Sequence, residues 1–86
     1  MEKWPFLNEA VGAVVRNRRR ELDLSKRSLA TLAMVERAHI RNIEGDDGNI
    51  SLNLFFYLAD ALDLEPEDFL FRIKKEMKKH AYGDED

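Results

Sequence analysis

Hydrophobic residues along the chain recur at intervals of three and four positions, which is the spacing of one face of an α-helix. No segment alternates hydrophobic and polar residues over the length of a strand, so we expect no sheet. The predicted fold class is therefore all-α, a compact five-helix domain over residues 1–80 with an acidic flexible tail over residues 81–86. The predicted helices cover about residues 7–22, 25–33, 36–44, 51–62 and 65–79.

Polar residues and a proline mark where the predicted helices begin and end. Ser25 and Ser51 stand directly before the second and fourth helices, where a hydroxyl oxygen accepts a hydrogen bond from a free backbone N–H group. Pro66 falls in the first turn of the fifth helix, which tolerates proline because the N–H group there has no partner within the helix. Asp23 is expected to end the first helix, since aspartate tolerates a left-handed backbone better than most residues do.

The fourth predicted helix holds more hydrophobic residues than one buried face needs. The spacing assigns its inner face to Leu52, Phe55, Leu58, Ala59 and Leu62. Three further residues fall on other sides of the helix and form the candidate dimer interface: Leu54, Phe56 and Tyr57. Together with Leu32 they are equally candidates for a surface that binds another protein, and the plain alternative is that they belong to the core.

The charge of the chain is unevenly distributed, and this matters more than its net value of −3. Residues 11–44 contain eight basic and four acidic residues, whereas residues 45–86 contain five basic and eleven acidic ones. A basic first half and an acidic second half favour one charged working face that binds a polyanion such as nucleic acid. The simpler interpretation, that the charges only solvate small helices, explains the total but explains the segregation less well.

Several classes of function are disfavoured by missing residue types. The chain has no cysteine, which excludes disulfides and thiolate metal sites, and His39 and His80 are not at metal-ligand spacing. There is no phosphate-cradling glycine loop and no serine with an evident base, so we expect no enzyme, no cofactor and no small-molecule ligand. No apolar run approaches the length of a membrane span and residues 1–5 show no signal-peptide pattern, which predicts a soluble cytoplasmic protein.

Two short helices joined by a tight turn, over about residues 25–44, meet the demands on a DNA-reading helix pair. The second helix must present polar side chains to the major groove, and Arg37 is the first choice because its guanidinium can bond guanine O6 and N7 together. The candidate base contacts are Arg37, His39, Arg41 and Asn42. The candidate phosphate contacts are Arg16 and three residues at the start of the first helix of the pair, where free N–H groups favour anions: Ser25, Lys26 and Arg27.

The order of these motifs resembles the phage-repressor/Cro-type (XRE) family of helix-turn-helix regulators. The resemblance covers about residues 8–71 and rests on four stretches, Leu24–Ala30, Ile40–Glu44, Ser51–Phe55 and Glu67–Leu70. It implies a repressor-type domain that binds double-stranded DNA as a homodimer at a pseudo-palindromic operator and regulates transcription as a repressor or an activator.

Two further implications follow from the same resemblance. It implies a partly buried ion pair between Arg19 in the first helix and Glu44 at the end of the third. The length of the chain, its Asn49-Ile50-Ser51 loop and its Lys78-Lys79-His80 end are also similar to the small controller proteins of restriction–modification systems.

The chain departs from the family pattern at the edges of the motif. Lys26 stands where the family usually has glutamine, and Met34 occupies the turn position that usually carries glycine. A left-handed backbone at Met34 would cost about 1 kcal/mol, so the turn is open to alteration. Asp46 and Asp47 would repel phosphates that approach the loop after the third helix. These departures keep a second hypothesis open, in which the domain is an antitoxin-like or adaptor module that binds protein and has little affinity for DNA.

Overall fold

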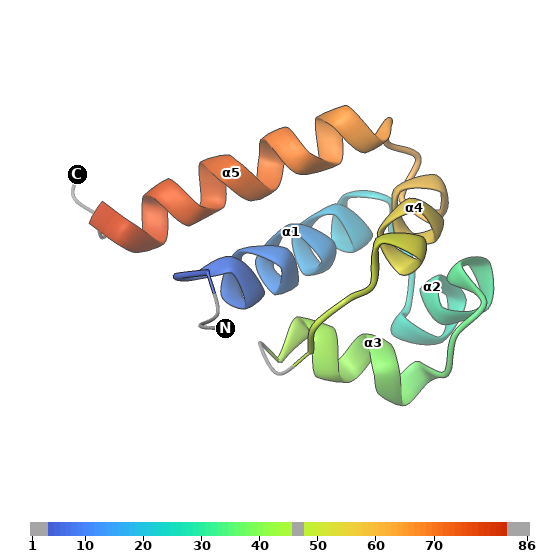
Figure 1. Cartoon of the computed structure of the whole chain (residues 1–86). Coiled ribbons are helices and arrows are strands. Elements are labelled where there is room, and N and C mark those ends of the chain that lie inside the picture. Colours follow the sequence, from blue (N-terminus) through green and yellow to red (C-terminus); the bar gives the residue numbers. More distant parts are fainter. Residues whose placement is uncertain (1–3, 46–47, 83–86) are drawn as a thin grey trace.

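The computed structural model describes residues 4–45 and 48–82, which fold into five α-helices without a strand among them (Figure 1). The all-α, five-helix prediction is therefore confirmed, and the predicted boundaries lie within a few residues of the observed ones. The helices are α1 (Leu7–Glu21), α2 (Lys26–Ala33), α3 (Arg37–Glu44), α4 (Leu52–Ala61) and α5 (Pro66–Tyr82).

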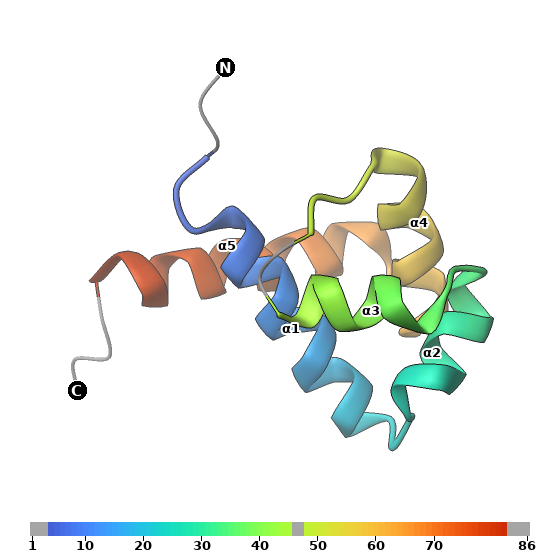
Figure 2. The ribbon, with the colours of Figure 1, turned by 90° about the horizontal axis from the view of Figure 1, so that it is seen from below.

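The central helix is α1, which packs against α5 on one side and against α3 on the other (Figure 1). The pair α2 and α3 lies at the opposite edge of the molecule from α5, and α4 bridges α2 and α5. In the view from below, α3 lies across the front of the domain with α2 beside it (Figure 2). The core between these helices is apolar and includes Val15, Leu29, Ile40 and Phe69, each fully buried.

Aspartate ends two of the helices in a left-handed conformation. Asp23 follows α1 with a φ of 59°, and Asp63 follows α4 with a φ of 56°. Beyond Asp23 the amide of Leu24 donates a hydrogen bond to the carbonyl of Arg19 at 3.0 Å, which satisfies one of the last carbonyls of α1. The expectation for Asp23 is therefore confirmed, and the same short reversal is repeated between α4 and α5.

The inner face of α4 differs from the one that the spacing predicted. Leu54 is 7 % exposed and belongs to the core, whereas Leu52 is 72 % exposed. The reason is that α2 also packs against α4, so that Leu54 lies beside Ala33 and Met34 at the end of α2. The assignment of Leu54 to the dimer interface is therefore wrong, while Phe56 and Tyr57 keep about half of their surface exposed.

The last helix continues past its predicted end at Lys79. Ala81 and Tyr82, assigned to the tail from the sequence, are helical residues of α5. The extension lies beside the start of the chain, because the ring of His80 stacks on that of Phe6 with centroids 6.2 Å apart. The remainder of the predicted tail, residues 83–86, lies outside the described residues.

None of these five helices is both long enough and apolar enough to cross a membrane, a statement that covers residues 4–45 and 48–82 only.

Candidate nucleic-acid interface

The first element of the candidate interface is the N-terminal end of α2. The Oγ atom of Ser25 accepts a hydrogen bond from the amide of Ser28 at 3.0 Å, so Ser25 caps the helix as predicted. The amides of the first turn and the positive end of the helix dipole favour an anion here. Arg27 is exposed and Lys26 is half-buried at this end, so both keep polar atoms near the position that a phosphate would take.

The turn between α2 and α3 has the left-handed geometry that family members usually obtain with glycine. Met34 has φ 60° and ψ 42°, and the following amide of Val35 donates to the carbonyl of Ala30 at 2.9 Å. The departure at Met34 therefore changes the residue without abolishing the turn. The side chain of Met34 is 76 % exposed and stands beside the start of α3.

The second element is the outward face of α3. Ile40 and Ile43 are buried, and the opposite side of the helix exposes Arg37, Arg41 and Asn42. Three of the four predicted base contacts thus lie on one face, because they recur at helical spacing. His39 is separated from them: it is half-buried and lines a hollow together with Ser51, Asn53 and Tyr57 around α4.

Sequence reasoning overlooked Ala38 on the outward face. It is exposed, and the advance of roughly 100° per residue places it between Arg41 and Asn42 on the outward face of α3. A small apolar side chain in this place fits against a thymine methyl group. The sequence contains the signal for this position, because Ala38 precedes Asn42 by four positions and therefore shares its side of the helix.

A buried ion pair fixes the far end of α3 to α1. The guanidinium of Arg19 bonds both carboxylate oxygens of Glu44, from Nε to Oε2 at 2.7 Å and from Nη2 to Oε1 at 3.0 Å. Arg19 also donates from Nη1 to the carbonyl of Leu24 at 2.9 Å. The hydrogen bond with Glu44 outweighs the opposing effect of burial and raises the pKa of Arg19. The ion pair that the family resemblance implied is present, and it fixes the position of α3 relative to α1.

Two other arginines of α1 bond the ends of neighbouring helices. Arg16, predicted to contact phosphate, donates from Nη1 to the carbonyl of Glu44 at 3.1 Å and so already has one partner at the C-terminal end of α3. Arg18 donates from Nε to the carbonyl of Leu62 at 2.9 Å and thereby ties α1 to the end of α4. Helical spacing along α1 does not indicate this partner of Arg18, which lies 44 positions further along the chain.

A separate apolar surface is formed by exposed residues of α4 and α5. Leu52, Phe56 and Leu70, called here the α4 seam, are 72, 52 and 51 % exposed. Leu52 and Leu70 border a hollow of about 330 Å³ between α1, α4 and α5. Exposed hydrophobic residues of this size make the α4 seam a candidate interaction surface.

The model of a helix-turn-helix family matches residues 15–69, which is most of the chain and includes the whole candidate interface. The chain belongs to the XRE/Cro-type helix-turn-helix family. This is a family of DNA-binding transcription regulators and not of enzymes. The sequence-based identification of the family and the prediction that the chain is no enzyme are thereby confirmed.

Three solved structures illustrate what this helix-turn-helix protein is similar to. The restriction-modification controller protein C.AhdI from Aeromonas hydrophila is 32 % identical with a TM-score of 0.69, over 72 % of this chain and 94 % of that one. The clp gene regulator ClgR from Corynebacterium glutamicum is 27 % identical with a TM-score of 0.84, over 91 % of this chain and 83 % of that one.

The third is the controller protein C.Esp1396I, solved as a tetramer in complex with its natural 35 base-pair operator. It is 24 % identical with a TM-score of 0.79, over 86 % of this chain and 97 % of that one, and at this identity the likeness concerns the fold. No curated protein sequence matches the chain significantly.

Proposed function

We propose that this helix-turn-helix protein is a sequence-specific regulator that binds double-stranded DNA as a homodimer on a pseudo-palindromic operator. The observation that carries the proposal is the outward face of α3, where Arg37, Arg41 and Asn42 are exposed together on a helix anchored by a buried ion pair. A reading helix must be held firmly, because displacement by about an ångström would misplace every base contact.

The two parts of the interface take different roles in this proposal. Arg37 bonds guanine in the major groove, Arg41 and Asn42 bond bases further along it, and His39 approaches the DNA from the side of α4. Ser25, Lys26 and Arg27 meet phosphates at the start of α2, which fixes the register but carries no sequence information. Arg16 remains a candidate phosphate contact, although one of its donors is already engaged by Glu44. Asp46 and Asp47, expected to repel phosphates, lie outside the described residues.

The homodimer forms through the α4 seam, with Tyr57 at its margin. Phe56 and Tyr57 were expected there from the sequence, and Leu52 and Leu70 take the place of the buried Leu54. A two-fold axis through this surface presents two copies of α3 to successive major grooves on one side of the duplex, about 34 Å apart. The cytoplasmic location expected from the sequence is part of this proposal, because a protein that regulates transcription works inside the cell.

Selection of bound sequences from a random duplex pool at two salt concentrations tests this function. The expected result is a pseudo-palindromic consensus whose affinity falls steeply with salt, because each neutralised phosphate releases counterions. Sequence enrichment that is absent at both salt concentrations would overturn the proposal.

A second candidate function, docking of another protein, draws support from Leu32 and Met34. These side chains, in α2 and directly after it, are 53 and 76 % exposed and do not belong to the α4 seam. Such a module would show little salt dependence and no shift with any duplex, so the same selection separates the two functions.

A further inference from the structure

A hollow of about 290 Å³ lies where the segment before α1 meets the last turns of α5. Most of its surface comes from six residues, called here the arm–α5 hollow: Trp4, Phe6, Lys74, Met77, Lys78 and Tyr82. The expectation of no small-molecule ligand rested on local motifs. None of these motifs covers a hollow whose walls come from opposite ends of the chain.

Most of the surface of the arm–α5 hollow is aromatic or apolar. The side chains of Trp4 and Tyr82 are 68 and 76 % exposed and that of Phe6 is 41 % exposed, so all three rings are accessible to solvent. Met77 is half-buried and packs against the core behind them. Sites for small molecules are concave, lined mainly by apolar and aromatic side chains, and begin at about 300 Å³, so this hollow suits a ligand with a single ring system.

The backbone at Phe6 adopts an unusual conformation at the edge of this hollow. Phe6 is the N-cap of α1 with φ 62° and ψ 10°, whereas N-cap residues ordinarily have an extended backbone. The amide of Leu7 donates a hydrogen bond to the carbonyl of Trp4 at 3.2 Å, and the ring of Phe6 stacks on that of His80. These contacts fix the start of the chain beside α5. Unfavourable left-handed conformations of this kind cluster at ligand-binding sites.

Two lysines supply the charge of the arm–α5 hollow. Lys74 and Lys78 are exposed and stand four positions apart, which makes them neighbours on one side of α5, and Tyr82 follows after four more. None of the described residues that line the hollow is acidic. Neither lysine forms an ion pair within residues 4–45 and 48–82. The hollow is therefore complementary to a molecule with an apolar body and an anionic group.

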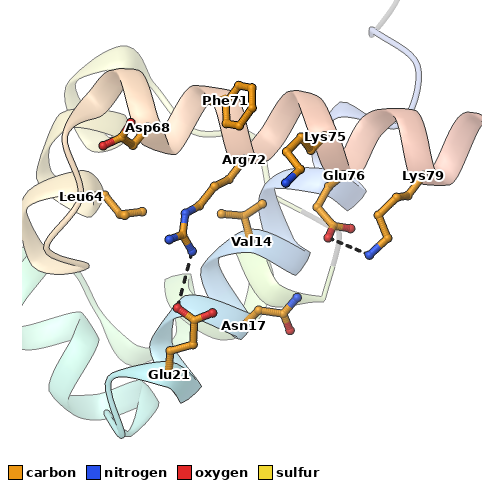
Figure 3. A pocket seen from close by; sticks show the side chains of 10 residues that line it. All are labelled: Val14, Asn17, Glu21, Leu64, Asp68, Phe71, Arg72, Lys75, Glu76 and Lys79. Carbon is orange, nitrogen blue, oxygen red and sulfur yellow. Dashed lines mark hydrogen bonds and ion pairs between the residues drawn. The ribbon is translucent and has the colours of Figure 1, made fainter.

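The larger groove between α1 and α5, of about 520 Å³, differs from the arm–α5 hollow in its charge. Figure 3 shows the side chains of Arg72, Lys75 and Lys79 along this groove. Arg72 lies 3.5 Å from Glu21 of α1, and Lys79 lies 3.4 Å from Glu76 (Figure 3). Three acids and three bases line the groove in all. The positive charge of the groove is balanced by its own walls, whereas that of the arm–α5 hollow is not.

We propose that the arm–α5 hollow binds a small aromatic carboxylate. The ring of the ligand stacks against Trp4 and Tyr82, and its carboxylate accepts hydrogen bonds from the ammonium groups of Lys74 and Lys78. A bilayer surface or a single-stranded nucleic acid also attracts aromatic and basic residues, but both are extended, whereas this hollow is small and has two lysines. The proposal does not depend on DNA binding, because α3 lies at the opposite edge of the molecule from α5 (Figure 1).

A nuclear magnetic resonance titration of the full chain with cinnamate tests the proposal. Trp4 is the only tryptophan, so its indole N–H gives a single signal at the proposed site. This signal and the amides of the last turns of α5 are expected to shift and to saturate together. Cinnamyl alcohol keeps the ring without the charge and is expected to bind about tenfold more weakly, because it lacks a charge-assisted hydrogen bond. Cyclohexylpropionate keeps the charge without the aromatic ring and is also expected to bind more weakly than cinnamate.

Matched variants separate the hollow from a general effect of charge. K74Q/K78Q is expected to weaken the binding of cinnamate about tenfold and to leave that of cinnamyl alcohol unchanged. K75Q/K79Q changes the net charge equally on the same helix but alters the groove beside α1, and it is expected to bind cinnamate like the wild type. W4L is expected to weaken the binding of both ligands, followed through the amides of α5. Thermal melts of all variants check that these exposed substitutions leave the fold intact.

The remaining outcomes contradict the proposal. A wild-type chain without saturable shifts would overturn it, as would a K74Q/K78Q chain that binds cinnamate with undiminished affinity. Equal losses in K74Q/K78Q and K75Q/K79Q would show a general effect of charge in place of a site. Cyclohexylpropionate that binds as tightly as cinnamate would remove the role of the aromatic rings. Co-sedimentation with phosphatidylglycerol vesicles that depends on Lys74 and Lys78, without any response to cinnamate, would assign these residues to a membrane surface instead.

Discussion

The two ends of this domain differ in the kind of side chain that they expose. The α2–α3 end carries exposed basic and polar side chains, and it is anchored from below by arginines of α1 that bond the last residue of α3. The α4–α5 end, over residues 52–82, holds six acidic and five basic residues and exposes Leu52, Phe56, Leu70 and Phe71. The α2–α3 end therefore presents polar groups in fixed positions, and the α4–α5 end presents exposed apolar side chains.

Comparison of the two ends shows how the short helix α3 is held in position. Helix α3 has eight residues, too few for stability in isolation, so its geometry depends on tertiary contacts. The buried side chains of Ile40 and Ile43 pack α3 against the core, and the bidentate ion pair between Glu44 and Arg19 fixes its C-terminal end. The α4–α5 end is tied to α1 in another way, by the hydrogen bond from Arg18 to the carbonyl of Leu62 and by the exposed ion pair between Arg72 and Glu21.

The largest effect is expected from breaking the buried ion pair. Glu44→Gln should lower the free energy of unfolding by about 3–5 kcal/mol, since it leaves the Arg19 charge buried without a counter-charge. Chemical denaturation measures this loss. Glu21→Gln is the matched control, because Glu21 forms exposed ion pairs and its loss should cost at most about 1 kcal/mol. A Glu44→Gln protein that melts at the wild-type temperature would disprove the anchoring role.

The next effect compares two leucines two positions apart in α4. Leu54→Ala should cost about 2–5 kcal/mol of stability, because it opens a cavity in the core beside α2. Leu52→Ala should change stability by no more than about 0.5 kcal/mol, since that side chain is exposed, and should instead weaken self-association. Denaturation and sedimentation of both variants check this. Equal losses of stability would mean that the assignment of the inner face of α4 is incorrect.

A smaller effect is expected in DNA binding. Arg37→Ala should cost about 1–3 kcal/mol on the selected operator and relax the preference at one base pair. Lys26→Ala should weaken binding to all sequences about equally and reduce the salt dependence, as expected for a phosphate contact. Fluorescence anisotropy with cognate and scrambled duplexes measures both. An Arg37→Ala protein with unchanged sequence preference would remove Arg37 from the reading face.

The smallest effect concerns the turn between the two helices of the motif. Met34→Gly should raise the free energy of unfolding by about 1 kcal/mol, because glycine adopts the left-handed conformation without a clash at Cβ. Asp23→Gly, at the equivalent position after α1, should gain less, since aspartate already tolerates that backbone. Denaturation curves for the two variants test the order. A destabilised Met34→Gly protein would show that the methionine side chain contributes contacts that outweigh its backbone strain.

Features that depend on neighbours along the chain could be predicted from the sequence alone. Helix periodicity, the serine caps at Ser25 and Ser51 and the reversal at Asp23 are local effects, and each was predicted where it occurs. The position of the helix-turn-helix and the outward direction of Arg37, Arg41 and Asn42 follow from the same periodicity. The pairing of Arg19 with Glu44 came from the family resemblance.

Features that depend on contact between elements far apart in the chain became visible only in the folded structure. A helix such as α4, apolar on most sides, does not reveal which side α2 and α5 will cover, so Leu54 and Leu52 exchanged their expected places. The hydrogen bonds of Arg16 and Arg18, the separation of His39 from the other reading residues and the extension of α5 to Tyr82 have the same cause. Each requires the packing of the finished fold, which no local spacing contains.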